Sequence, residues 1–223
     1  FSADAEQTMR LSISGSYTLD NSLQYSVGGG EWIQLTASTP ISFGGAEGNL
    51  RLRGQSSGGL ARGYGTYAKI TFGNRKVLVS ASGDIRTLID YKAYDTVSTA
   101  NARFCRMFSG CTNLTSAPVL PATTLADACY YSMFDGCTNL TSAPALPATT
   151  LAHECYSGMF DGCTSLTSAP ALPATTLATT CYSGMFEGCT SLTTAPELPA
   201  TTLAAKCYTS MFKGCTSLST APE

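Results

Sequence analysis

The 223-residue sequence has little charge and very little histidine. Charged residues make up 13% of the chain and the net charge is −2, whereas an average soluble protein has about 25% charged residues. The basic excess that phosphate-backbone binding needs is missing, so we expect no nucleic-acid partner. No apolar stretch approaches the roughly 20 residues of a membrane-spanning helix, so we expect no membrane span. The single histidine, His153, excludes most histidine-based catalysis and most histidine-rich metal sites.

Cysteine is absent from the first hundred residues. The rest of the chain holds all ten cysteines and nine of the ten prolines. Such a change in composition is typical of a domain boundary. We therefore predict two domains, residues 1–97 and residues 98–223.

A repeat of 26 residues fills the second part of the chain. Four full copies begin at residues 111, 137, 163 and 189, a partial copy begins at 215, and a degenerate leader spans 104–110. Self-similarity at a fixed period of this length is typical of solenoid proteins. One cysteine series opens the copies and a second lies within them: Cys111, Cys137, Cys163, Cys189 and Cys215, and Cys129, Cys155, Cys181 and Cys207.

Apolar residues in the second half of each copy recur at a spacing close to that of a helix. Leu125, Cys129, Met133 and Cys137 lie four residues apart, which predicts an apolar helical stripe. The proline-rich segment 140–147 is too short for a helix and predicts a brief strand. Stacked units of strand, turn and helix predict a leucine-rich-repeat α/β solenoid.

The first part of the chain alternates apolar and polar side chains in short segments. Gly, Asn, Ser and Pro clusters separate these segments, which predicts an all-β antiparallel sandwich over residues 1–97. The glycine-rich segment 54–65 predicts a long mobile loop. The predicted strands lie at 8–13, 23–27, 31–36, 48–53, 67–72 and 76–82.

The cysteine spacing does not favour metal binding or disulfides. Separations alternate between 8 and 18 residues, and eight helical residues span about 12 Å, too far for a bridge and unlike paired zinc knuckles. Bridges between equivalent cysteines of adjacent copies are the alternative. We predict free, buried thiols that act as small hydrophobes, with Cys105 of the leader as the exposed one. No metal and no cofactor is predicted.

Aromatic side chains supply two further candidate binding residues, and the repeated tyrosines give a prediction about the core. Trp32, beside a predicted hairpin turn at 28–30, is either a core residue or a platform for a sugar ring, and Tyr64 is predicted to be exposed. The repeated tyrosines are expected at the edge of the core with their hydroxyls outward.

Glycosidase chemistry needs a close carboxylate pair, and the acidic residues of 1–97 are scattered, so their spacing indicates no such pair. We therefore predict that the chain is not an enzyme.

Hydroxyl side chains form two rows along the predicted strands of the repeats. A lattice of uncharged hydroxyls suits hydrogen bonding to a glycan or an extended protein, and a solvated ladder without a ligand is the alternative. The predicted binding residues are Thr115, Ser116, Thr141, Ser142, Thr167, Ser168, Thr193 and Thr194.

The repeated string M-F-x-G-C-[TS]-x-L-T-x-A-P-x-L-P over residues 104–223 resembles the BspA-like bacterial surface leucine-rich repeats, which are abundant in Bacteroides. Segments 25–32 and 83–89 resemble the β-sandwich module that often precedes such repeats. The resemblance implies a secreted or surface-anchored protein that functions in adhesion. Residues 1–4 show neither the basic nor the apolar region of a signal peptide, so we expect none within this sequence.

These observations lead to two hypotheses of function. The first is a non-catalytic, secreted or cell-surface adhesion protein that recognises a host or matrix protein or a glycan through the repeat strand face, the sandwich tip, or both. The alternative is a structural stalk that displays the sandwich as a carbohydrate-binding module. Solenoids normally end in a polar capping unit, and the last repeat lacks one, so in either case we expect that the native chain continues or that a partner covers the C-terminal edge.

Overall fold

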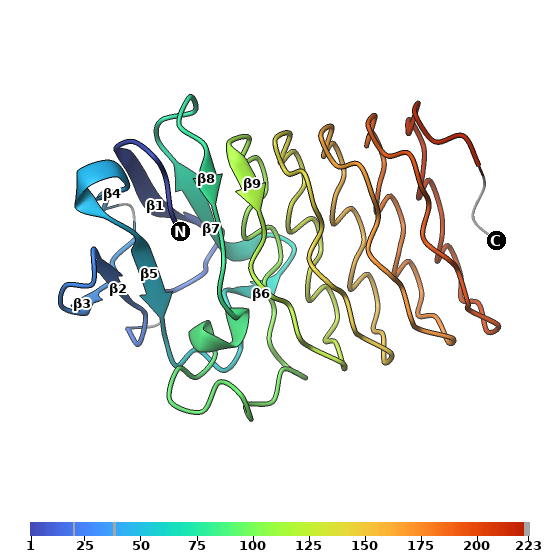
Figure 1. Cartoon of the computed structure of the whole chain (residues 1–223). Helices are drawn as coiled ribbons and strands as arrows, with labels where there is room; N and C mark the ends of the chain where they lie inside the picture. Colours follow the sequence, from blue (N-terminus) through green and yellow to red (C-terminus); the bar gives the residue numbers. More distant parts are fainter. Residues whose placement is uncertain (20, 38, 221–223) are drawn as a thin grey trace.

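The computed structural model describes residues 1–19, 21–37 and 39–220. Small β-sheets form the N-terminal part, and the repeats are stacked against it as a row of coils that runs to the C-terminus (Figure 1). The larger sheet is antiparallel and has four strands. In spatial order these are β4 (Ile41–Phe43), β1 (Gln7–Ser14), β7 (Thr66–Phe72) and β6 (Ala61–Gly63).

The second antiparallel sheet has three strands. Its spatial order is β3 (Ile33–Gln34), β2 (Gln24–Val27) and β5 (Leu50–Arg53). These strands lie within the alternating segments of the sequence, so the prediction of antiparallel strands there is confirmed. The sequence did not predict β4 or β6, and β6 lies inside the glycine-rich segment that was expected to be a loop.

Period-2 alternation explains why β1 and β7 pair. Met9 and Leu11 of β1 are buried and lie opposite Phe72 and Ile70 of β7. Alternate side chains of a strand point to opposite faces, so this register places the apolar set of both strands on one face. The sheet contributes that face to the hydrophobic core.

Backbone pairing joins the N-terminal sheets directly to the repeats. Strand β8 (Val79–Ser80) pairs in parallel with β9 (Leu114–Ser116) of the first copy. The Ile70 N–H donates to the Met107 carbonyl at 2.8 Å. The buried apolar residues of both parts belong to one continuous cluster. The boundary near residue 98 remains a prediction, and the core runs across it.

The predicted α/β leucine-rich-repeat solenoid is wrong. The described residues contain no α-helix, and the helical elements there are the short 3₁₀ segments η1 (Gly45–Glu47) and η2 (Ile85–Leu88). The predicted helix of the first copy is a run of turns. The Tyr130 N–H donates to the Cys155 carbonyl of the next copy at 2.8 Å, whereas the Met133 N–H returns to the Tyr130 carbonyl at 3.1 Å.

Left-handed residues explain why a helix does not form. Ala128, Ser132 and Gly136 have φ values of 55°, 48° and 69°, and a right-handed helix needs negative φ at every position. The apolar residues therefore repeat with a strict period of four, whereas a helix repeats at 3.6. Glycine at 158 and 184, which are equivalent to Ser132, is the sequence signal for this conformation.

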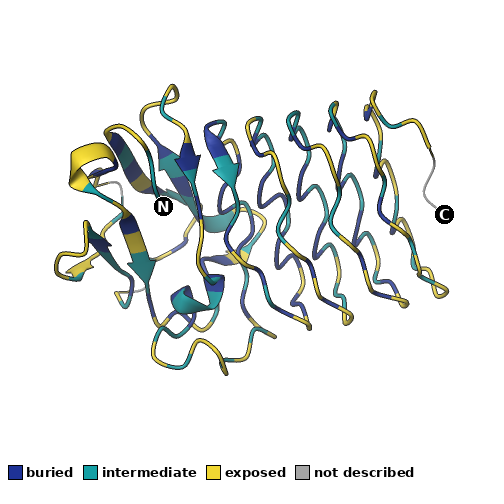
Figure 2. Cartoon of the chain, in the orientation of Figure 1, coloured by how far each residue is buried: buried dark blue, intermediate teal, exposed yellow. Residues whose placement is uncertain are grey.

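Equivalent aromatic rings stack from one coil to the next. Phe134 and Phe160 are parallel with centroids 5.6 Å apart, and Tyr156 and Tyr182 are 5.8 Å apart. Buried segments accordingly recur at the same place in each coil (Figure 2). The phenylalanine column is Phe108, Phe134, Phe160, Phe186 and Phe212, and the other column is Phe104, Tyr130, Tyr156, Tyr182 and Tyr208.

All ten cysteines are free and buried, as the sequence predicted. The exception predicted for Cys105 is wrong, because this thiol is fully buried and its burial raises the thiol pKa to about 11. The Cys111 thiol donates to the Ile70 carbonyl of β7, and each later thiol that opens a copy donates to a carbonyl of the preceding coil, for example from Cys137 Sγ to Phe108 O at 3.2 Å. These hydrogen bonds therefore help to hold adjacent coils together.

The tyrosine hydroxyls of the central copies also differ from expectation. Tyr156 and Tyr182 are 1% exposed, and their hydroxyls are buried without a hydrogen-bond partner in the described part of the chain. The expectation that these hydroxyls point outward is therefore wrong. Close ring stacking places the whole side chain inside the coil.

Candidate binding groove

A groove of about 950 Å³ lies beside β5, where the N-terminal sheets meet the first repeat. Figure 1 shows β5 opposite the segment that follows β8. Leu50 and Leu52 of β5 line it on one side, Ile85 and Leu88 of η2 on another, and Phe108 of the leader adds an apolar ring. The volume and the mixture of apolar and polar lining are typical of ligand sites. We call this hollow the β5 groove.

Arginine and aromatic side chains form the polar rim of the β5 groove. The Arg53 guanidinium carbon lies 4.0 Å from the ring centroid of Trp32 and 4.2 Å from that of Tyr91. Its Nε donates to Gln24 Oε1 at 2.9 Å. Such cation–π contacts hold a guanidinium in place without neutralising it. Within the described residues, neither Arg53 nor its exposed neighbour Arg51 forms an ion pair.

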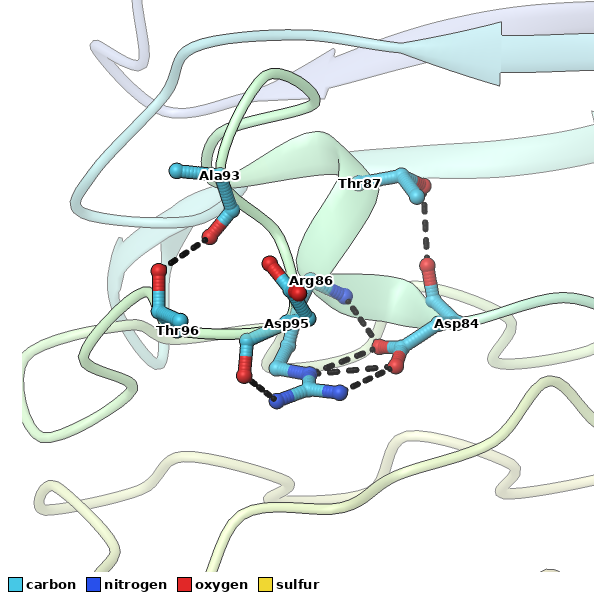
Figure 3. Close-up of polar contacts among 6 residues, drawn as sticks. All are labelled: Asp84, Arg86, Thr87, Ala93, Asp95 and Thr96. Atoms are coloured by element: carbon cyan, nitrogen blue, oxygen red, sulfur yellow. Dashed lines mark hydrogen bonds and ion pairs between the residues drawn. The ribbon is translucent and has the colours of Figure 1, made fainter.

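The acid of the groove lining has a cationic partner. The Asp84 carboxylate accepts from the Arg86 backbone N–H at 2.9 Å and from its guanidinium Nη2 at 2.7 Å (Figure 3). Arg86 Nη1 in turn donates to the Asp95 carbonyl at 3.1 Å. This bonding raises the pKa of Arg86. The network fixes the start of η2 and the loop after it, and it leaves Arg51 and Arg53 as the charged side chains of the groove lining that form no ion pair among the described residues.

The outer edge of β5 is paired at both ends and open between them. The Leu50 N–H donates to the Phe1 carbonyl and the Gly54 N–H to the Thr87 carbonyl, both at 2.9 Å. In antiparallel pairing alternate residues direct their N–H and C=O to the same edge, so those of Leu52 also point away from β2. Neither Leu52 group has a hydrogen-bond partner in the described chain.

The predicted hydroxyl rows lie on the repeats, outside the groove lining. Thr115 and Ser116 of β9 are half-buried, and Thr115 Oγ1 donates to the Val79 carbonyl at 3.1 Å. Two hydroxyls of the later copies bond within the stack, from Thr141 to the Thr115 carbonyl and from Thr193 to the Thr167 carbonyl. The exposed members are Thr141, Ser142, Thr167, Ser168, Thr193 and Thr194.

The structure brings Trp32 into the groove and places Tyr64 elsewhere. Tyr64 is 43% exposed, but its ring contacts Tyr131 at 4.8 Å and its hydroxyl lies 3.4 Å from His153 Nδ1. The glycine-rich segment therefore lies against the repeats. Sequence reasoning missed Arg51 and Arg53 as site residues. Their alternation with Leu50 and Leu52 was the available signal, because it places both arginines on one face of a strand.

Two further observations concern metals and membranes. In the part of the chain that the structure describes, no three His, Cys, Asp or Glu side chains are grouped so as to hold a metal ion. Among the same residues, no helix has the length and apolar character needed to cross a bilayer.

Comparison with known proteins gives no relative on which to base a function. No family model, curated protein or solved structure matches the chain. The likeness of the repeats to the BspA-like type therefore rests on the repeated string alone, and the functional argument rests on the geometry of the β5 groove.

Proposed function

We propose that this chain is a non-catalytic binding protein of the cell exterior whose partner, a protein or a glycan, occupies the β5 groove. One observation carries the proposal: two arginines without an ion pair, aromatic rings and apolar side chains line the same hollow. The rings at its rim include those of Trp32, Tyr91 and Tyr94. The exterior location rests on the resemblance of the repeat string.

Contacts within the protein hold the polar side chains of the β5 groove in place. Arg53 is held between two rings and η2 is held by Asp84 and Arg86, so these groups are preorganised before a ligand arrives. Preorganised groups lose less conformational entropy on binding, which favours affinity. The stacked repeats then function as a carrier of the groove, which corresponds to the stalk hypothesis with the binding site at the junction.

The exposed hydroxyl rows are the second candidate surface. Ser168 and Thr194 form a parallel bridge, so equivalent hydroxyl positions lie side by side in adjacent coils. A repeating polymer would meet the same groups at each coil. The rows have hydrogen-bonding groups but no charge or ring, so we rank them after the β5 groove.

A binding screen with matched variants tests the proposal. The full chain is applied to arrayed glycans and extracellular-matrix proteins, together with Arg51→Ala, Trp32→Ala and the control Arg75→Ala, which alters an exposed arginine outside the groove lining. A charge-assisted hydrogen bond contributes about 1.5–3 kcal/mol, so we expect Arg51→Ala to weaken the strongest signal about tenfold or more. Arg75→Ala is expected to leave that signal unchanged.

A further variant separates the two surfaces. The double substitution Ser142→Arg and Ser168→Arg places bulky cations in the hydroxyl rows. If this variant removes binding while Arg51→Ala and Trp32→Ala retain it, the site lies on the repeats and the proposal for the groove is wrong. The same conclusion holds if no signal responds to either groove variant.

A further inference from the structure

We infer that the ligand of the β5 groove is an acidic glycan, which binds Arg51 and Arg53 through a carboxylate or sulfate group. The inference rests on the proposed function, because it names the class of ligand that the same groove takes. Three features of the structure support it: two guanidinium groups against one ring, the orientation of the Arg53 side chain, and the uncharged polar groups of the groove lining.

Two positive charges lie against one aromatic ring. Arg51 and Arg53 are two residues apart on β5, so their side chains leave the same face of the strand. Their guanidinium carbons lie 5.7 and 4.0 Å from the centroid of the Trp32 ring. The ring attracts each cation, but the two cations repel each other. Neither forms an ion pair with the residues that the structure describes, so a ligand oxyanion that contacts both guanidinium groups would offset this repulsion.

Contacts within the protein orient the Arg53 guanidinium. Its carbon lies 4.0 Å from the centroid of the Trp32 ring and 4.2 Å from that of Tyr91, and its Nε donates to Gln24 Oε1 at 2.9 Å. In the described part of the chain, no acceptor bonds to either Nη atom. The N–H groups of a guanidinium edge match two oxygens of a carboxylate or sulfate. The contacts therefore leave a preorganised donor pair for such a group.

The arginines lie on a face of the three-stranded sheet, where a peptide strand has no run of free backbone positions to join. The Leu50 N–H already donates to the Phe1 carbonyl and the Gly54 N–H to the Thr87 carbonyl, both at 2.9 Å. The other edge of β5 pairs with β2. Strand addition, by which extended peptides bind sheets, is therefore blocked at β5. This favours a ligand that is recognised through side chains.

Uncharged polar side chains of the groove lining suit the hydroxyls of a saccharide. Asn49 and Ser82 are exposed and line the groove, together with the Tyr94 ring, which is 42% exposed. Amide and hydroxyl groups donate and accept hydrogen bonds, as sugar hydroxyls do. The groove volume of about 950 Å³ lies at the upper end of the range for ligand sites, which suits an oligosaccharide. The groove therefore combines anion-binding and hydroxyl-binding groups.

Matched pairs of glycans test the inference with the full chain. One pair is an oligogalacturonate and its carboxyl-reduced form, and the other is a sulfated oligogalactan and its desulfated form. We expect the acidic member of at least one pair to bind about tenfold or more tightly than its neutral partner, because charge-assisted hydrogen bonds are lost with the anion. The pair that shows the preference identifies the group as a carboxylate or a sulfate. Added salt should weaken the binding, because the rim charges are partly exposed.

Variants of the two arginines test charge and geometry separately. Arg51→Glu reverses a charge at an exposed position and should abolish the preference for the acidic glycan, whereas the control Arg75→Glu makes the same change outside the groove lining and should leave it unaltered. Arg53→Lys keeps the charge but loses the planar donor pair, so we expect binding to weaken about tenfold. If Arg53→Lys lowers the thermal midpoint, Arg51→Glu alone decides the test.

The outcomes separate the inference from the proposed function. If neither acidic glycan binds more tightly than its neutral partner, or if Arg51→Glu leaves the preference unchanged, the inference is wrong. If a neutral glycan or a hexaglutamate peptide binds instead and is lost in Trp32→Ala, the inference is wrong and the binding function of the groove stands. If no probe responds to Arg51→Glu or to Trp32→Ala, both fail.

Discussion

The N-terminal sheets and the repeat stack satisfy their backbone hydrogen bonds in different ways. In the sheets, strands of different sequence pair in an antiparallel manner, as β1 does with β7. In the stack, each coil donates to an equivalent carbonyl of the next copy, as Phe134 does to Met159. The first arrangement joins strands of different sequence, whereas the second joins near-identical copies whose equivalent side chains lie next to one another.

This difference explains where distinctive chemistry gathers. Identical copies place identical side chains side by side, which produces ring columns inside and hydroxyl rows outside. A groove with arginines, aromatic rings and an apolar floor needs residues that occur once. The β5 groove lies at the junction, where the first coil meets a sheet that does not repeat. Three substitutions test this comparison.

The largest effect is expected in the phenylalanine column. Phe160→Ala removes a fully buried ring between Phe134 and Phe186, each 5.6 Å away. Loss of a buried aromatic side chain costs about 3–5 kcal/mol because a cavity remains. Denaturant unfolding measures the change. The control is Phe212→Ala at the equivalent, half-buried position of the last described coil, where we expect less than half that cost. Equal costs would show that the column does not depend on neighbours at both sides.

A smaller effect of opposite sign is expected in the tyrosine column. Tyr156→Phe removes a buried hydroxyl without a partner, and burial raises its pKa well above the usual value. An unsatisfied buried polar group costs about 1–3 kcal/mol, so we expect the thermal and denaturant midpoints to rise. Tyr208→Phe, at a half-buried position, should change stability by only a few tenths of a kcal/mol. Destabilisation by Tyr156→Phe would show that the hydroxyl has a partner, such as buried water.

The smallest effect concerns the left-handed residues that replace the predicted helix. Lys206 has φ of 57°, a conformation that costs an L-residue about 1–2 kcal/mol. Lys206→Gly relieves this cost but adds freedom to the unfolded chain, so we expect a gain of about 0.5–1 kcal/mol. Ala205→Gly at the exposed adjacent position should lose a similar amount. A loss in both variants would support a helical backbone and contradict the turn conformation.

The sequence predicted the antiparallel strands and the free cysteines for physical reasons that act locally. Alternation at residues 67–72 places Ala68, Ile70 and Phe72 on one face whatever the neighbouring strand is. Cysteine at a fixed period within an apolar pattern indicates burial. The helix prediction failed because a spacing of four residues resembles the 3.6-residue period of a helix over a short segment. The left-handed conformation of residues in each copy is favoured only when the adjacent copy accepts their hydrogen bonds.

The candidate site was only partly visible in the sequence. Trp32 was recognised as a candidate, and the Leu-Arg-Leu-Arg alternation was visible, but nothing local places Trp32 or Tyr91 against Arg53. These residues are separated by 21 and 38 positions from Arg53, and pairing of β2 with β5 and the position of η2 bring them together. The residues of the hydroxyl rows, in contrast, could be named from the sequence, because the repeat period alone aligns them.

The sequence by itself determined the repeat period, the burial of the cysteines in each copy and the apolar faces of β1 and β7, because these depend on neighbours along the chain. Only the tertiary structure decided that the repeats form stacked turns and that Arg51 and Arg53 lie beside Trp32 and Tyr91. Both outcomes depend on hydrogen bonds and charges contributed by distant residues. A backbone amide takes whichever acceptor the fold brings to it, and in these coils that acceptor lies one copy away.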